Sequence, residues 1–167
     1  RAQGIFSTQS AFAALTEEGT VVAWGDSSSG GIAPSGLTNV QTIFSNDDAF
    51  AALKKDGTVV AWGNPNYGGS MSDSGLYTGV PTNLANVKTI YPCKYAFAAL
   101  KEDGTVQAWG FREWGGAAVP ANLTNVIAIY ATGMAFAALR EDGTVRAWGS
   151  GESGGAGVPT DLSHVTA

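Results

Sequence analysis

Histidine and cysteine are almost absent from this chain, and their scarcity limits the chemistry it can perform. His164 is the only histidine and Cys93 the only cysteine among 167 residues. A zinc site built from several such side chains is therefore excluded, and so is an internal disulfide. A Ser-His-Asp triad would have to use His164, and nothing in the sequence around it suggests one. We expect no metal, no cofactor and no enzymatic activity.

Charge is also sparse, and positive charge most of all. The chain has 9 Lys and Arg against 14 Asp and Glu, for a formal net charge of -5. The cations are scattered, so neither a basic stripe for nucleic acid nor a polybasic segment for an anionic membrane is present. No apolar run reaches the length that spans a bilayer. We expect a protein partner, no nucleic acid and no membrane insertion.

What the chain has in abundance is glycine, 23 residues of it, and one repeated pattern. The string Ala-Phe-Ala-Ala-Leu occurs four times, at 11–15, 49–53, 96–100 and 135–139. A Trp-Gly pair follows each string at a fixed offset, and a Gly-Gly pair comes next. Repeats of this length indicate an array of small units that bury their faces against one another. We predict one repeat domain over 1–167, with copies at 3–39, 40–86, 87–125 and 126–165.

Each copy is typical of about three antiparallel strands, which predicts an all-β fold of propeller-type blades. The first strand is expected at 3–6, 40–44, 87–91 and 126–130, the second in the Ala-Phe-Ala-Ala-Leu string and the third before each Trp-Gly, as at 105–109. Asp-Gly, or Glu-Gly in the first copy, separates the second and third strands and favours a two-residue hairpin turn. The second copy carries an insertion at 70–80.

Successive apolar residues in the second strand predict burial on both faces, as in sheets stacked on one another. One large aromatic pair per copy would fill the space between sheets. The residues predicted to form this core are Trp24, Trp62, Trp109, Trp148, Phe12, Phe50, Phe97 and Phe136.

The pattern Asp-Gly-Thr-Val, Ala-Trp-Gly, Gly-Gly and Val-Pro resembles the regulator-of-chromosome-condensation repeat family. Segment 99–110, followed by Val119 and Pro120, is similar to bacterial members with three-stranded blades, such as the propeller-type β-lactamase inhibitors. The family commonly has Gly-Gln where this chain has Gly-Gly, and it forms seven-bladed rings where this chain has four copies. The resemblance implies a propeller that is part of a longer array, a four-bladed ring, or a ring completed by self-association with a second chain.

The four copies differ chiefly in two windows. One precedes the second strand, at 7–10, 45–48, 92–95 and 131–134, and the other follows Trp-Gly, at 26–29, 64–67, 111–114 and 150–153. An up-down-up strand order places both windows on one face, as binding loops lie on other scaffolds. Aromatic residues and Arg are the types enriched in interface hot spots. The predicted partner-binding residues are Phe111, Arg112, Trp114, Glu113, Tyr67, Asn66, Tyr95, Lys94, Asp47, Asp48, Asp26 and Glu152.

These windows favour a protein-binding module that is secreted or lies on a bacterial cell surface, although a cytoplasmic location also fits the cysteine content. Three alternatives stay open at this point. The first is an inhibitor of a secreted enzyme such as a β-lactamase. The second is a structural repeat of a large surface protein whose loops have drifted, and the third is a nucleotide exchange factor for a small GTPase. The exchange-factor hypothesis would use the insertion at 70–80.

Overall fold

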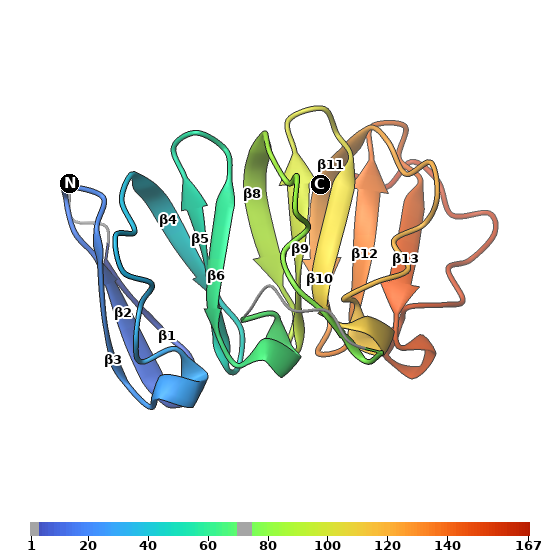
Figure 1. Cartoon of the computed structure of the whole chain (residues 1–167). Helices are drawn as coiled ribbons and strands as arrows, with labels where there is room; N and C mark the ends of the chain where they lie inside the picture. The colour runs from blue at the N-terminus through green and yellow to red at the C-terminus, as the bar shows by residue number, and fades with distance from the viewer. Residues whose placement is uncertain (1–3, 70–74) are drawn as a thin grey trace.

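The computed structural model describes residues 4–69 and 75–167, which form four small antiparallel sheets placed side by side in chain order (Figure 1). The first sheet contains β1 (Gly4–Ser7), β2 (Ala11–Leu15) and β3 (Val21–Gly25). The second contains β4 (Val40–Ser45), β5 (Ala49–Lys54) and β6 (Val59–Gly63). The third contains β8 (Val87–Pro92), β9 (Ala96–Lys101) and β10 (Val106–Phe111), with β7 (Tyr77–Thr78) beside β10. The fourth contains β11 (Val126–Ala131), β12 (Ala135–Arg140) and β13 (Val145–Gly149).

One 3₁₀ turn follows the last strand of each copy. These turns are η1 (Ser27–Ser29), η2 (Pro65–Tyr67), η3 (Arg112–Trp114) and η4 (Gly151–Ser153). The predicted all-β class with about three antiparallel strands per copy is confirmed. No helix in the described segments is long and apolar enough to cross a membrane. Residue 3 of the predicted first strand lies outside the described residues, and that strand is observed at Gly4–Ser7.

The hairpin turn between the second and third strands is one residue longer than the sequence predicts. In the second sheet Lys54 N donates to Thr58 O, and Gly57 N donates to Lys54 O. Three residues therefore form the loop, with Gly57 at φ 85° as its last member. Asp-Gly also occurs in three-residue loops that end with a residue of positive φ. The prediction of a two-residue loop was therefore wrong.

The insertion in the second copy supplies a strand to its neighbour. Strand β7 pairs with β10 through Thr78 opposite Gly110 and Tyr77 opposite Phe111. Its short length gives no alternating pattern that a sequence could reveal. The third sheet consequently has four strands, and the second and third copies are joined at their outer side.

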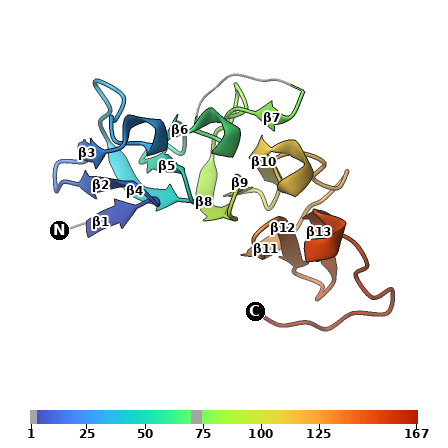
Figure 2. The same ribbon diagram turned by 90° about the horizontal axis from the view of Figure 1, so that it is seen from below.

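The sheets stack face to face along an arc that is open on one side (Figure 2). A separate cluster of buried apolar residues lies between each pair of successive sheets. We call each such contact layer a seam. The first two alanines of each string and its leucine face the later sheet, whereas the phenylalanine and the third alanine face the earlier one. The unbroken apolar string therefore has the two-sided burial that its sequence predicts.

The predicted aromatic core is correct at the three seams and wrong at the first sheet. Phe50 and Trp62 stack with ring centroids 5.2 Å apart and are 0% and 5% exposed. The corresponding Phe12 and Trp24 stack in the same way but are 46% and 45% exposed. Each aromatic pair projects towards the preceding sheet, and no described residue precedes the first sheet. The pair of the first sheet therefore has the same stacked geometry as the buried pairs, and it is exposed because no described sheet covers it.

Candidate protein-binding surface

Both variable windows lie at the same edge of every sheet, as the strand order predicts. The residue after each Trp-Gly pair donates its backbone N–H to the link between the first two strands. These bonds are Asp26 N to Ser10 O, Asn64 N to Asp48 O, Phe111 N to Tyr95 O and Ser150 N to Met134 O, at 2.8–3.1 Å. We call this the window edge, and the opposite edge, with the Asp-Gly loops, the turn edge.

One position in the first window has a structural role in all four copies. Its side chain donates to the carbonyl of the last residue of the adjacent 3₁₀ turn. The four bonds are Thr8 Oγ1 to Ser29 O, Asn46 Nδ2 to Tyr67 O, Cys93 Sγ to Trp114 O and Thr132 Oγ1 to Ser153 O. Sequence reasoning missed this role because four copies fill the position with three residue types.

Cys93 is therefore a structural thiol. It is buried, and desolvation raises its pKa to about 11. A thiol with so high a pKa stays protonated at neutral pH and can therefore donate a hydrogen bond to the Trp114 carbonyl.

Two of the acidic residues predicted to bind a partner, Asp26 and Asp48, accept hydrogen bonds from the scaffold. The Asp26 carboxylate caps η1 by accepting from Ser28 N and Ser28 Oγ, and the side-chain bond is the main cause of its lowered pKa. Asp48 accepts from Ser29 Oγ at 2.9 Å and thereby ties the first sheet to the second. These carboxylates hold local structure in addition to any contact they make outside the chain.

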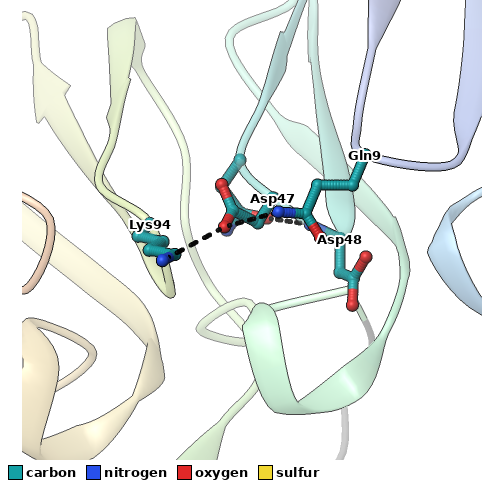
Figure 3. Close-up of polar contacts among 5 residues, drawn as sticks. Gln9, Asp47, Asp48 and Lys94 are labelled. Carbon is teal, nitrogen blue, oxygen red and sulfur yellow. Dashed lines mark hydrogen bonds and ion pairs between the residues drawn. The ribbon is translucent and has the colours of Figure 1, made fainter.

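Asp47 lies at the centre of a short polar chain that links the first, second and third sheets (Figure 3). The Gln9 amide Nε2 donates to its carboxylate at 3.3 Å, and Lys94 Nζ lies 3.9 Å from the same oxygen. Lys94 Nζ also lies 5.7 Å from the Tyr95 ring centroid, within the range of a cation–π contact. The Lys94 side chain is 48% exposed, so this cation remains accessible.

Aromatic side chains gather at the window edge of the second and third sheets. Tyr95 is central, with its ring centroid 4.9 Å from that of Tyr67 and 4.5 Å from that of Trp114. Phe111 lies 4.2 Å from Trp114 and 5.2 Å from Tyr77. We call these five residues the aromatic patch. All five are half-buried, so each ring packs on its neighbours and still presents part of its surface.

Polar groups border the aromatic patch. Burial raises the pKa of Tyr67, which keeps its hydroxyl protonated at neutral pH. An open pocket of about 580 Å³ brings Arg112, Glu113 and Trp114 together with Glu152 of the fourth sheet. Asn66 is exposed beside Tyr67. The structure thus groups most of the predicted residues around one region, whereas Asp26 belongs to the first sheet and lies away from it.

Tyr77 is the member of the patch that sequence reasoning missed. It lies in the insertion at 70–80, of which residues 70–74 are outside the described part of the chain. Its place depends on β7 joining β10, which brings Tyr77 opposite Phe111. The only available signal was the presence of an aromatic residue within an insertion.

No protein-family model and no curated protein matches the chain, but several solved structures resemble it. Prp20 from Saccharomyces cerevisiae, described with its binding to Gsp1p and histones, has a TM-score of 0.65 and 22% identity over 97% of this chain and 49% of Prp20. The same yeast protein, called RCC1 and bound to Kap60, has a TM-score of 0.63 and 22% identity over 97% of this chain and 47% of that one. The ectodomain of the receptor kinase CR4 from Physcomitrella patens has a TM-score of 0.64 and 22% identity over 89% of this chain and 39% of its own.

These comparisons define the fold class. The four stacked antiparallel sheets have the fold of β-propeller blades and are similar in structure to those of Prp20. The chain spans about half the length of the yeast protein and less of the plant ectodomain. At such low identity the likeness concerns the fold, and function has to be argued from the surface.

Proposed function

We propose that the chain is a non-enzymatic protein-binding module and that the aromatic patch is its contact surface. The observation that carries the proposal is the convergence of five half-exposed rings from four separate segments at one edge. Rigid aromatic side chains lose little conformational entropy on binding and dominate the energetics of protein interfaces. Contiguous apolar surface of this kind on a folded protein marks an interaction site.

The charges around the patch fit the same role. Lys94, Arg112 and Glu113 border the rings, which gives an apolar centre and a polar rim. The fold neighbours that have a protein partner described with them, Prp20 with Gsp1p, histones and Kap60, support protein recognition as a use of this scaffold. A fold supports several functions, so the patch and not the likeness carries the proposal.

The test is a capture experiment with three forms of the chain immobilised. The native chain is compared with a patch variant (Tyr67→Ser, Tyr95→Ser, Trp114→Ser) and with the control Ile32→Ser. Ile32 is 71% exposed in a loop of the first copy, so its loss removes exposed apolar surface away from the patch. We expect a partner that the native and control chains retain and the patch variant loses, with circular dichroism showing that all three are folded.

The captured partner is then purified and its affinity measured. Loss of several hot-spot residues weakens binding by at least about 100-fold, since each is worth about 2 kcal/mol or more. Equal recovery by all three forms would contradict the proposal. The chain would then be a structural repeat whose loops have drifted.

A narrower form of the proposal is inhibition of a secreted enzyme such as a β-lactamase. It is supported by the similarity of segment 99–110 to bacterial three-stranded blades, and it requires a secreted or cell-surface location. A titration of β-lactamase should then lose activity with the native chain and keep it with the patch variant. Full activity at micromolar native chain would remove this narrower form and leave protein binding to be tested by capture.

A further inference from the structure

A groove of about 570 Å³ lies beside the outer edge of the third sheet. It is lined by Val106, Gln107 and Ala108 of β10 and by the connecting segments 78–82 and 116–119. Successive residues of a strand point to opposite faces of a sheet, and yet all three of these residues line the groove. The groove therefore follows the edge of β10 and not one face of the sheet. None of the described residues that line it carries a charge.

Both connecting segments are fixed by contacts within the chain. Val80 is buried in the seam between the second and third sheets, and Val119 packs against the seam between the third and fourth. Thr78 Oγ1 donates to Gly116 O at 2.9 Å and joins the two segments next to β7. The groove is thus formed before any ligand binds, as most binding sites are.

The backbone of β10 directs alternate residues towards the groove. Phe111 N donates to Tyr95 O, so Phe111 and every second residue before it bond to β9. The residues between them are Gly110, Ala108 and Val106. Their N–H and C=O groups therefore point to the outer side of the sheet.

Strand β7 covers the first of these three residues and no more. Gly110 N donates to Thr78 Oγ1 at 3.1 Å, and the pairing of β7 ends at Thr78. The chain then leaves the edge, because Val80 turns into the seam between the second and third sheets. Among the described residues, no group pairs with the outward N–H and C=O of Ala108 or Val106.

We propose that this groove binds an uncharged, extended segment of another protein, which pairs with Ala108 and Val106 as a strand in line with β7. An added strand gains its affinity from main-chain hydrogen bonds to an exposed sheet edge. Strand β7 shows that this edge accepts an antiparallel partner, and the uncharged lining favours a segment without charged side chains. The described lining includes no residue of the aromatic patch, so a peptide in the groove leaves that patch open.

The register of β7 predicts how the segment lies. Thr78 is opposite Gly110, so a continued antiparallel strand places one residue opposite Ala108 and the next but one opposite Val106. Each of these two residues donates one hydrogen bond to β10 and accepts one. Thr and Val suit such a segment, because both favour an extended backbone and neither is charged.

The first test uses the capped peptide acetyl-Thr-Val-Thr-Val-Thr-amide and the ¹⁵N-labelled 167-residue chain. We expect the backbone amide signals of Val106 and Ala108 to shift and saturate, with a dissociation constant of about 1 mM or lower. The amide of Tyr95, at the window edge, should not move. Unchanged signals of Val106 and Ala108 at about 5 mM peptide would overturn the proposal.

Main-chain recognition is tested with two N-methylated forms of the same peptide. Methyl groups on both valines block one edge of the extended peptide and leave the other edge able to pair, so this form should still bind. Methyl groups on the valines and on the threonines that follow them block both edges, and binding should weaken by at least about 10-fold. Equal binding of the doubly blocked and unmethylated peptides would overturn strand pairing.

The place of binding is tested with a matched pair of variants. Thr82 is exposed and lines the groove, so Thr82→Trp should fill it and weaken peptide binding by at least about 10-fold. Thr160 is exposed at the equivalent position of the fourth copy, and Thr160→Trp should bind as the native chain does. A folded Thr82→Trp chain that binds the peptide normally would overturn the proposal.

The patch variant distinguishes this site from the aromatic patch. The variant Tyr67→Ser, Tyr95→Ser, Trp114→Ser should bind the peptide as the native chain does, whether or not the capture experiment finds a partner. Loss of peptide binding by that folded variant would place the peptide on the patch and overturn the groove as its site.

Discussion

The two edges of the sheets are stabilised in different ways, and the difference explains where variation is found. At the turn edge backbone bonds close the loop, as from Lys54 N to Thr58 O, and the loop Asp adds a recurring side-chain bond. In three copies this Asp accepts from both the backbone and the hydroxyl of the following Thr. At the window edge the residue after each Trp-Gly pair donates its backbone N–H to the preceding link, and this bond does not depend on the type of its side chain. Side chains at the window edge are therefore free to differ, except where they or a glycine also support the fold.

The largest loss of stability is expected from changing a glycine at the window edge that contacts the next sheet. Gly115 has φ 104°, and a Cβ there would lie 2.7 Å from the Phe136 ring. The backbone cost of about 1–2 kcal/mol and an overpacking cost of about 1–3 kcal/mol suggest that Gly115→Ala lowers the free energy of unfolding by about 2–5 kcal/mol. Urea unfolding measures this loss.

Gly151→Ala is the matched control at the same edge. The nearest atom to its added Cβ is Ala156 Cβ at 3.7 Å, so we expect a change within about 0.5 kcal/mol. Equal losses for the two variants would show that close approach between sheets is not what requires glycine at 115.

A smaller loss is expected from the structural position in the first window. Asn46 donates to Tyr67 O at 2.8 Å and accepts from Asp48 N and Ala49 N, and it is buried. Asn46→Ala leaves these groups without partners and should cost about 1–3 kcal/mol in urea unfolding. Asn66→Ala removes an exposed amide from the second window and should change stability by less than about 0.5 kcal/mol. Similar losses would mean that the two windows tolerate change equally.

At the turn edge we expect replacement of the loop Asp residues to cause a modest, pH-dependent loss of stability. Bonds from the following Thr lower the pKa of Asp56, Asp103 and Asp142 in the folded chain. Their stabilisation is complete above the unfolded pKa of about 3.9 and is lost as pH falls through the lower folded pKa. The triple Ala variant should therefore melt below the native chain at pH 7, and the gap should narrow at pH 2.5.

Glu141→Ala provides the comparison for that measurement, because Glu141 is exposed in the same kind of loop. It should melt with the native chain at both pH values. A gap for the triple variant that stays constant with pH would show that the carboxylate charge is not involved.

The smallest loss of stability is expected when Cys93 is replaced by the residue type that other copies have at the same position. Thr8 and Thr132 make the bond that Cys93 makes in the third copy. Cys93→Thr should therefore retain it and shift stability by less than about 1 kcal/mol, whereas Cys93→Ala should lose more. Urea unfolding of the pair distinguishes the two, and a larger loss for Thr than for Ala would contradict the assigned role.

Sequence alone predicted the repeat, the strands and the aromatic core, because each follows from a local pattern that occurs four times. It failed at Phe12 and Trp24, whose sequence context matches that of the buried pairs. Burial is decided by what lies next to a sheet, and identical strings cannot report that. The prediction of the turn length was wrong for a related reason, since Asp-Gly occurs in both two-residue and three-residue loops.

At the window edge the sequence predicted four of the five rings in the aromatic patch. Tyr77 could not be assigned, because its place depends on a two-residue strand pairing with the next copy. The role of Cys93 was hidden, since a thiol, a hydroxyl and an amide make the same bond. Whether the patch residues contact a partner stays a prediction until the capture experiment is done.

Strand β7 has a consequence for how the molecule opens. It makes β10 an inner strand, whereas β3, β6 and β13 remain edge strands among the described residues. Gly110 N donates to Thr78 Oγ1 and Arg112 N to Leu76 O, so these amides are covered on the side that the other sheets leave open. Their hydrogens should exchange with deuterium more slowly than that of Gly63 at the end of β6. Strand β7 would then protect the outer edge of the third sheet from local opening.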